Sequence, residues 1–392
     1  MTTVYLDHVA ANPVDKRVAE TMMPYISGNY GNPSALYEQG RIAAQAIDKA
    51  RQQVASLINA KPEEIIFTSC GTESNNFALH GLAQANIKKG KHIITSAIEH
   101  FSIHHPLKTL EKQGFKVTQV PVDGNGIVKL DELKKAITPE TILISITHAS
   151  NEIGTIEPIA EISQIIRQAT GDGRQAPCFH VDAVQAAGVI PVDVQTLGID
   201  ALSLAADQFY GPKGIAALYL KKGTRILPFL EGGIQEGGKR SGTENVSGIV
   251  GMGKAAELAK AEMKERTALL KKLQKKLMDG LKTKVPTFHL TGDAEQRLPN
   301  HVSGCVEFIE GESMSMFLDM EGISVSTGSA CVSKALKASH VLLAVGVARE
   351  MVNGSIVFSF GKDTTEADID YLLEKFPPIV ERLQSMSPLK KG

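Results

Sequence analysis

The chain has 392 residues, with 42 basic and 43 acidic side chains and a formal net charge of -1. This length predicts one large and one smaller domain. The balanced charge excludes a whole-molecule field that would attract nucleic acid or an anionic membrane. The chain shows neither an apolar run of about 18 residues for a membrane span nor a basic, apolar leader. We therefore expect small molecules or proteins as partners.

The four cysteines give information about the redox environment. Cys70, Cys178, Cys305 and Cys331 are scattered along the chain without CxxC spacing. This arrangement predicts neither a disulfide framework nor a zinc site. Reduced thiols of this kind fit a cytoplasmic protein, which is the location that we expect.

Short apolar runs alternate with segments of helical period over the first two thirds of the chain. Helical patterns such as residues 50–59 and 159–169 lie between several short apolar runs rich in β-forming residues. Such runs, separated by crossover helices, predict a mostly parallel seven-stranded sheet covered on both faces. We expect this large α/β domain at residues 15–260. Its strands are expected at residues 64–69, 92–96, 116–122, 141–148, 178–183, 200–205 and 214–220.

A long helical pattern at residues 248–284 leads out of the large domain. Beyond it, the pattern predicts short strands near residues 304–309 and 354–359. Helices are expected near residues 311–321 and 365–385. Together with the N-terminal residues, this predicts a small α+β domain made of residues 1–14 and 261–392.

Polar residues follow several of the predicted strands, at the sheet edge where ligands bind in such folds. The segment CGTESNN (70–76) is a Gly-Thr turn that opens a helix and would suit a phosphate, although an ordinary helix cap remains the alternative. His100 and His104 have the i, i+4 spacing of metal ligands, but no acidic or thiol ligand completes a metal site. Asn151 and Asp182 also follow strands, where such residues often form structural turns.

Nine motifs in order carry a family resemblance. They read LDHVAANPV, GNPSALYEQGR, FTSCGTESNN, EHFSI, NEIGTIEPI, HVDAVQAAG, FYGPKG, RSGTEN and STGSACVSK. In order and spacing, the chain resembles the cysteine desulfurases of the NifS/IscS type over essentially its whole length. The resemblance implies the type I fold of pyridoxal phosphate (PLP) enzymes, a homodimer, and a role as sulfur donor in iron–sulfur cluster assembly.

The resemblance also assigns ligands for the cofactor ring. Asp182 matches the carboxylate that pairs with the pyridine nitrogen, so that the ring can accept electrons. His100 matches the imidazole that stacks on the ring. Asn151 and Gln185 match the amides near the phenolic oxygen.

Three further positions match the phosphate site and the nucleophile of the family. Thr72, and Thr243 of the other subunit, match phosphate ligands. Cys331 matches the thiol that attacks the substrate sulfur and becomes a persulfide, and its Ser/Gly-rich loop predicts an exposed tip. The remaining cysteines, among them Cys70, are interpreted as structural thiols.

Four positions depart from the family pattern. Gln208 stands where the family has its Schiff-base lysine, and an amide cannot form that bond. Asp207 replaces a histidine that touches the phosphate or the ring oxygen in the family and helps to move protons, and Ala205 replaces a serine that binds the phosphate. Val357 replaces the arginine that binds the substrate carboxylate. Lys213 is not expected to substitute for the lost lysine, because the family carries it as well.

Three interpretations therefore stay open. The chain is a PLP-free partner that uses Cys331 as a sulfur or iron–sulfur cluster ligand for an IscU-like scaffold or another acceptor. Alternatively, it is an active desulfurase that holds PLP without a covalent bond. In the third, it is another PLP enzyme without a lysine aldimine, with Asp207 as the base. The first interpretation agrees best with the missing lysine and arginine.

Overall fold

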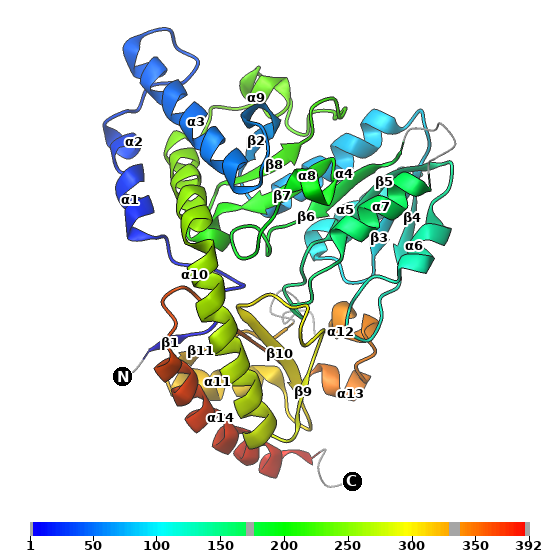
Figure 1. Cartoon of the computed structure of the whole chain (residues 1–392), viewed down its shortest axis with the longest axis vertical. Coiled ribbons are helices and arrows are strands. Elements are labelled where there is room, and N and C mark those ends of the chain that lie inside the picture. The colour runs from blue at the N-terminus through cyan, green and yellow to red at the C-terminus, as the bar shows by residue number, and fades with distance from the viewer. Residues whose placement is uncertain (1–2, 170–175, 329–337, 389–392) are drawn as a thin grey trace.

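A seven-stranded sheet forms the centre of the larger part of the computed structural model, which describes residues 3–169, 176–328 and 338–388 (Figure 1). β8 runs antiparallel to both of its neighbours, and the other neighbouring strands are parallel. The predicted α/β fold class is confirmed, and each strand lies within the residues expected for it. In spatial order the strands are β2 (Ile65–Thr68), β8 (Ala216–Leu220), β7 (Ala201–Ala205), β6 (Cys178–Asp182), β5 (Thr141–Thr147), β3 (His92–Ser96) and β4 (Lys116–Val120).

Helices bury both faces of this sheet. Because side chains alternate along a strand, Ile93 and Ile94 enter different hydrophobic cores. The first core also contains α4 (Gly71–Asn86) and α5 (Phe101–Lys112), and the second contains α3 (Glu38–Leu57), α7 (Ile159–Gln168) and part of α10 (Val246–Lys284). Strands buried on both faces need apolar residues at successive positions, which explains the continuous apolar runs. The shorter elements of this part are α1 (Lys16–Met22), α2 (Pro24–Ser27), η1 (Pro62–Glu64), α6 (Leu130–Ala136), α8 (Val194–Leu197), η2 (Ala206–Phe209) and α9 (Gln235–Gly238).

The smaller part contains a three-stranded antiparallel sheet in which β10 (His301–Val306) lies between β12 (Ser355–Ser359) and β9 (Phe288–Leu290). The N-terminal β1 (Val4–Tyr5) pairs in parallel with β11 (Ile323–Ser324), so the start of the chain joins this part. The expected strands and helices are therefore present, within a few residues of the expected bounds. The helices are α11 (Gly311–Met320), α12 (His340–Ala344), α13 (Arg349–Val352) and α14 (Glu366–Met386).

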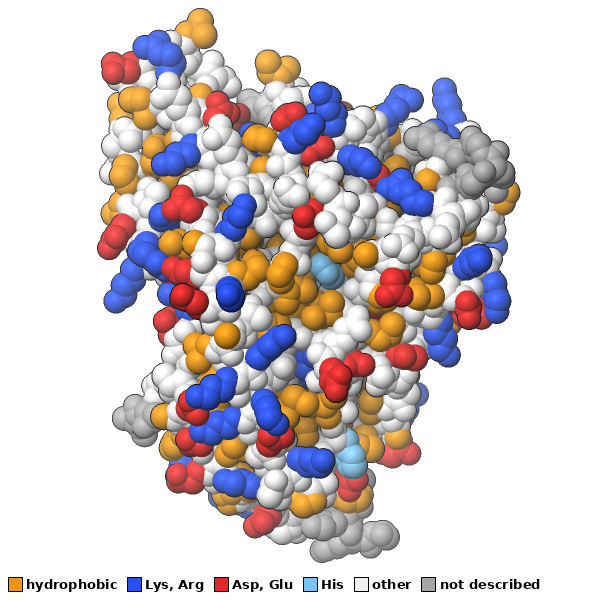
Figure 2. Space-filling view, in the orientation of Figure 1, with side chains coloured by type: hydrophobic (Ala, Val, Ile, Leu, Met, Phe, Trp, Pro, Cys, Tyr) orange, Lys and Arg blue, Asp and Glu red, His pale blue; other side chains and the backbone are white. Residues whose placement is uncertain are grey.

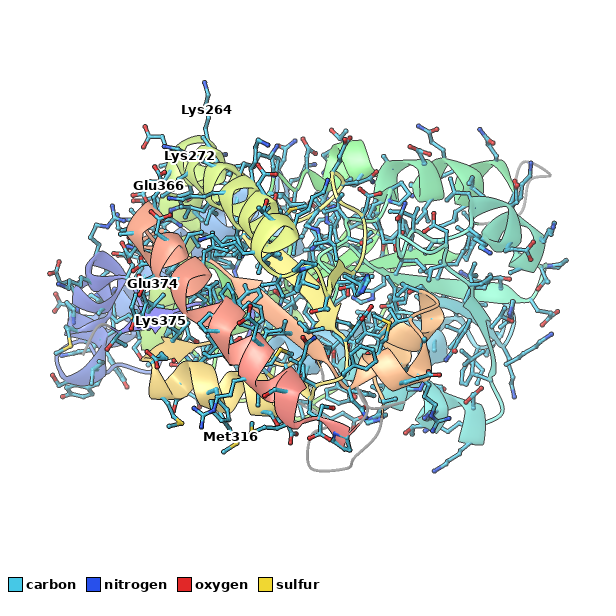
Figure 3. All side chains as sticks on the ribbon, turned by 90° about the horizontal axis from the view of Figure 1, so that it is seen from below. Lys264, Lys272, Met316, Glu366, Glu374 and Lys375 are labelled. Atoms are coloured by element: carbon cyan, nitrogen blue, oxygen red, sulfur yellow. The ribbon has the colours of Figure 1, made fainter. Side chains whose placement is uncertain are left out.

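The 39-residue helix α10 runs from the larger part into the smaller one (Figure 1). Its first half is buried with the large sheet, and its second half packs with α14 in a separate core. Figure 3 shows α10 and α14 side by side from below, with Lys272 and Glu366 paired across them at 2.5 Å. The face in Figure 2 carries basic and acidic side chains interspersed, as the balanced charge predicts. None of the described helices is long and apolar enough to cross a membrane.

Candidate active site

A cavity of about 390 Å³ lies where the carboxyl ends of the parallel strands meet the smaller part. β2, β3, β5, β6 and β7 all end at this edge of the sheet, so the residues after them converge. The cavity brings together every predicted site residue except Thr243 and Cys331. The predicted residues that line the cavity are Thr72, His100, Asn151, Asp182, Gln185, Ala205, Asp207, Gln208 and Val357.

Asp182 is the last residue of β6 and is buried against the cavity. Its Oδ2 accepts a 2.7 Å hydrogen bond from Asn75 Nδ2, and its Oδ1 accepts one of 3.0 Å from the Val184 backbone N–H. Burial raises the pKa of Asp182, because a charged carboxylate loses its water there; hydrogen bonds and nearby His100 oppose the rise. A donor placed against this carboxylate would therefore be bound firmly.

Asn75 and Ser102 were not predicted as site residues, yet both line the cavity and hold Asp182 in place. Asn75 Nδ2 also donates to Ser102 Oγ at 2.8 Å, while Asn75 Oδ1 is buried without a partner among the described residues. The signal available in the sequence was the polar run after the Gly-Thr turn. That run indicates polar residues on a helix, but it does not show that the side chain of Asn75 reaches Asp182 at the end of β6.

His100 caps the N-terminus of α5, where its Nδ1 accepts a 3.1 Å hydrogen bond from the Ser102 N–H. Because Nδ1 acts as an acceptor, the proton of a neutral ring lies on Nε2. Ser102 Oγ lies 2.8 Å from the same Nδ1, which fixes the ring from a second side. The imidazole is thus oriented by α5 itself and can face a flat ligand in the cavity.

The N-terminus of α4 forms another wall of the cavity, through Cys70, Gly71 and Thr72. A side chain at Gly71 would place its Cβ 2.7 Å from Val184, so glycine is required there. The free N–H groups of the 16-residue helix and the Thr72 hydroxyl provide donors for an anion. Cys70 is exposed and accepts from the Glu73 N–H at 3.4 Å, so its interpretation as a structural buried thiol is wrong. Cys305, by contrast, is buried.

The end of β7 and the turn η2 after it carry Ala205, Asp207 and Gln208. Ala205 is buried and presents only a methyl group. Gln208 Nε2 lies 3.4 Å from Asp207 Oδ2 and 3.5 Å from the Val9 carbonyl oxygen, both long for hydrogen bonds. Burial raises the pKa of Asp207, and the charge of Lys213 acts against that rise. This side of the cavity therefore carries a carboxylate and an amide, neither of which can form a Schiff base.

The backbone of η2 is fixed from outside the cavity. Tyr210 ends the turn in a left-handed conformation, with φ of 68°. Its carbonyl oxygen accepts from the Asp15 N–H at 3.0 Å, and its hydroxyl oxygen accepts from the Lys362 N–H at 2.6 Å. These contacts hold the backbone at Gln208 without using the Gln208 side chain.

Lys213 points away from the cavity. Its Nζ donates to the Asn12 carbonyl oxygen at 3.0 Å and lies in a different pocket, beside Tyr5 and Asp363. Within the described residues, no lysine and no arginine lines the cavity of Asp182.

Val357 and Glu152 complete the wall next to the smaller part. Val357 lies on β12, where its N–H donates to the Ser326 carbonyl oxygen at 2.8 Å, and its side chain is buried. Glu152 accepts a hydrogen bond from Ser339 Oγ, and burial raises the pKa of Glu152 to about 7. Glu152 was not predicted as a site residue. The amide of Asn151 and that of Gln185, which donates to the Val9 carbonyl oxygen at 3.2 Å, also line the cavity.

Two predicted residues lie elsewhere. Thr243 lines a separate pocket with Arg240 and Asn245, so a single chain does not bring it to Asp182. The resemblance assigns Thr243 to the cavity of a second subunit. Cys331 lies outside the described residues, although Thr327 and Gly328, which precede its segment, line the cavity.

Known proteins share this fold and sequence over nearly their whole length. The aminotransferase class-V family matches residues 4–372. Cysteine desulfurase IscS of Methanosarcina thermophila is 52% identical over 98% of this chain and 94% of its own length, and that of Dictyoglomus turgidum is 49% identical over 99% and 97%. The solved structure of a NifS-like protein matches with a TM-score of 0.91 and 40% identity, covering 97% of this chain and 100% of that one. The chain belongs to the IscS/NifS cysteine desulfurase family.

This family is PLP-dependent, so the cavity can be tested against that cofactor. Asp182, held by Asn75, and the oriented ring of His100 fit a pyridine ring, and the start of α4 fits an anionic group. The opposite wall does not fit covalent attachment, because Gln208 offers an amide without a reactive amine and Lys213 lines another pocket. The residues present therefore suit a ring that is bound without a covalent bond to the protein.

Proposed function

We propose that this chain acts in sulfur mobilisation and iron–sulfur cluster assembly as a family member without PLP–lysine chemistry. One observation carries the proposal. Gln208 lines the cavity at the lysine position, and no lysine among the described residues replaces it there. Val357 supports the proposal, because a buried valine offers no ionic partner for a substrate carboxylate.

In this function Cys331 is the working group. Cys331 accepts sulfur from, or passes it to, another protein, or supplies a thiolate ligand to a shared iron–sulfur cluster. The partner that fits this chemistry is an IscU-like scaffold or another sulfur acceptor. The relatives support the sulfur role, since the curated proteins above are named cysteine desulfurases.

A second candidate function is cysteine desulfuration with PLP held only by non-covalent contacts. The intact ring wall of Asp182, Asn75 and His100 favours it. It requires a base to move the substrate's α-proton, and in the cavity Asp207 and Glu152 are the carboxylates available besides Asp182. This candidate leaves the substrate carboxylate without an arginine partner.

The chain is proposed to work as a homodimer, with Thr243 of each copy reaching the cavity of the other. Large apolar side chains are exposed at the upper end of the larger part in Figure 1, on the segment after α2 and beside α9. Leu36 and Ile234 are each 90% exposed, and a dimer interface would bury such apolar side chains. The proposed domains are residues 15–260, and residues 1–14 with 261–392. One core contains only residues of the second set, which supports this division, whereas the core of the large sheet also includes Leu298, Cys305 and Val341 of that set. The cytoplasmic location stays a prediction.

Borohydride trapping tests the loss of lysine chemistry. The purified protein is mixed with PLP, reduced with borohydride and mapped by peptide mass spectrometry. We expect a colourless protein without a PLP–lysine adduct, because Gln208 has no amine. The matched variant Gln208→Lys should become yellow and carry an adduct at residue 208. An adduct on Lys213 of the unaltered chain would overturn the proposal.

Retention of a cluster tests the role of Cys331. The chain is copurified with a small iron–sulfur scaffold protein, and iron and sulfide are measured in the complex. Cys331→Ser should lower both by about half or more, whereas Cys178→Ser, outside the cavity, should leave them unchanged. Equal iron and sulfide in the two variants would contradict the proposed use of Cys331.

A further inference from the structure

The cavity is lined by more acidic than basic side chains, which is unusual for a site that is expected to hold an anionic aldehyde. Three carboxyl groups line it, on Asp182, Asp207 and Glu152. His100 is the only basic side chain among the described lining residues, and its Nδ1 already acts as an acceptor. The described walls are therefore rich in acceptors and poor in cations.

The altered wall, formed by Asp207 and Gln208, receives only long side-chain hydrogen bonds, although the Asp207 backbone N–H also acts on the Asp207 carboxylate. Asp207 Oδ2 receives the Gln208 amide at 3.4 Å, and that same amide is shared with the Val9 carbonyl oxygen at 3.5 Å. Gln208 Oε1 accepts no hydrogen bond within the described residues. Lys213 Nζ donates its hydrogen bond to the Asn12 carbonyl oxygen instead of Asp207, so the charge of Lys213 acts on Asp207 only from a distance. The altered wall thus offers a carboxylate and an amide oxygen to a donor that the chain does not supply.

A protonated primary amine is the group that complements this wall. It carries a positive charge and three N–H donors, whereas an aldehyde presents only an acceptor oxygen. At the opposite wall Asp182 already accepts from Asn75 and the Val184 N–H, and its carboxylate oxygens have lone pairs left for a further donor such as a protonated pyridine nitrogen. A ligand with donors at both ends would satisfy both carboxylates at once.

We propose that this cavity selects the amine form of the cofactor family, a pyridoxamine-type ring, over the aldehyde form. The ring nitrogen faces Asp182, and the ammonium group faces Asp207 and Gln208. This inference rests on the proposed loss of the Schiff-base lysine, since a lysine at position 208 would occupy the same wall and favour the aldehyde. No covalent step is involved.

Calorimetric titration of the full chain with four ligands tests the proposal. The ligands are pyridoxamine and pyridoxal, each with and without the 5′-phosphate, so that the amine is separated from the phosphate. We expect the amine to bind about tenfold more tightly than the aldehyde within each pair, as for a charge-assisted hydrogen bond. The phosphate should change both members of a pair in the same direction.

Three variants locate the preference. Asp207→Asn should reduce the amine preference to about threefold or less, because it removes the charge but keeps the shape. Asp182→Asn should weaken amine and aldehyde alike by about tenfold, since it acts on the shared ring. Asp319→Asn, exposed on α11, is the matched control and should change neither affinity. If Asp207→Asn fails to fold, Gln208→Glu provides a second test and should increase the preference.

The proposal is overturned if the aldehydes bind as tightly as the amines, or if none of the four ligands binds. Borohydride reduction of the same samples separates this failure from that of the proposed function. A trapped lysine adduct would contradict the loss of lysine chemistry, whereas tight aldehyde binding without an adduct would contradict only the amine preference.

Discussion

The two walls of the cavity differ in how firmly their side chains are held. At the ring wall, Asp182, Asn75, Ser102 and His100 are joined by hydrogen bonds of 2.7 to 2.8 Å. At the altered wall, the side-chain contacts of Gln208 are 3.4 and 3.5 Å long. Hydrogen bonds weaken steeply over this range, so the ring wall is preorganised and the altered wall is loosely ordered.

This difference indicates that the side chains of one wall can change without changes in the other wall. The ring wall depends on residues from one strand end and two helices, and a change at Asp182 or Asn75 leaves a buried polar group unpaired. The altered wall depends on side chains of one short turn, whose backbone is fixed elsewhere. Overall similarity to desulfurases therefore identifies the family. The reactive chemistry depends on a few positions, and these can differ even when the rest of the sequence is similar.

The largest expected effect comes from rebuilding the altered wall. Gln208→Lys alone should restore covalent PLP but release little sulfide from cysteine, because Val357 leaves the substrate carboxylate unpaired. Adding Val357→Arg should raise sulfide release by about 10- to 100-fold, the range expected for one charge-assisted pair. Sulfide is measured by a colorimetric assay under reducing conditions.

The single variant Val357→Arg is the control for this experiment and should remain inactive. It should also lower the thermal stability, because it inserts an unpaired charge at a buried position of β12. Strong sulfide release by Gln208→Lys alone would show that the two walls differ less than the side chains indicate.

A smaller effect is expected at the proposed dimer interface, which would bring Thr243 of one copy to the cavity of the other. Ile234→Asp places a charge on an exposed apolar position and should weaken dimerisation by roughly 100-fold. Light scattering after size-exclusion chromatography measures the mass. Met316→Asp, on an exposed residue of the smaller part labelled in Figure 3, is the matched control. A monomeric unaltered chain, or an unaffected dimer in Ile234→Asp, would contradict the interface.

The smallest effect on the site concerns Glu157, a buried acid outside the cavity. Glu157 accepts from the Val128 N–H at 3.0 Å through one oxygen, while the other has no partner among the described residues. Burial raises the pKa of Glu157 to about 8, and repulsion from Glu99 adds to the rise. A folded-state pKa above the unfolded value means that stability is present below about pH 4.5 and is lost as the pH rises toward 8.

Glu157→Gln removes the loss of stability at higher pH, because the amide cannot ionise and keeps the shape of the protonated acid. The variant should gain roughly 3 to 4 kcal/mol relative to the unaltered chain between pH 5 and pH 8, at about 1.4 kcal/mol for each pH unit. Urea unfolding at the two pH values measures the difference. Glu161→Gln, exposed on α7, is the control. A variant that gains nothing at pH 8 would show that Glu157 is ionised in the folded chain.

The fold could be predicted from the sequence because its signals are local. Seven apolar runs and the long pattern of α10 gave strands and helices close to those observed. The site was predicted in part, since the resemblance matched residues one by one and showed the gap at Gln208. Asn75, Ser102 and Glu152 were missed, because their importance depends on contacts between segments far apart in sequence. The direction of Lys213 likewise follows from the turn of η2, which no local pattern reveals.

Tyr210 fixes the backbone of η2 through contacts outside the cavity, and this has a consequence for how residue 208 can change during evolution. Because the backbone at Gln208 is held by contacts to Asp15 and Lys362, the side chain at residue 208 can be exchanged without rebuilding the turn. Glutamine and lysine codons differ only in their first base. A lineage could therefore lose the reactive amine, or regain it, by a single nucleotide change while the fold stays intact.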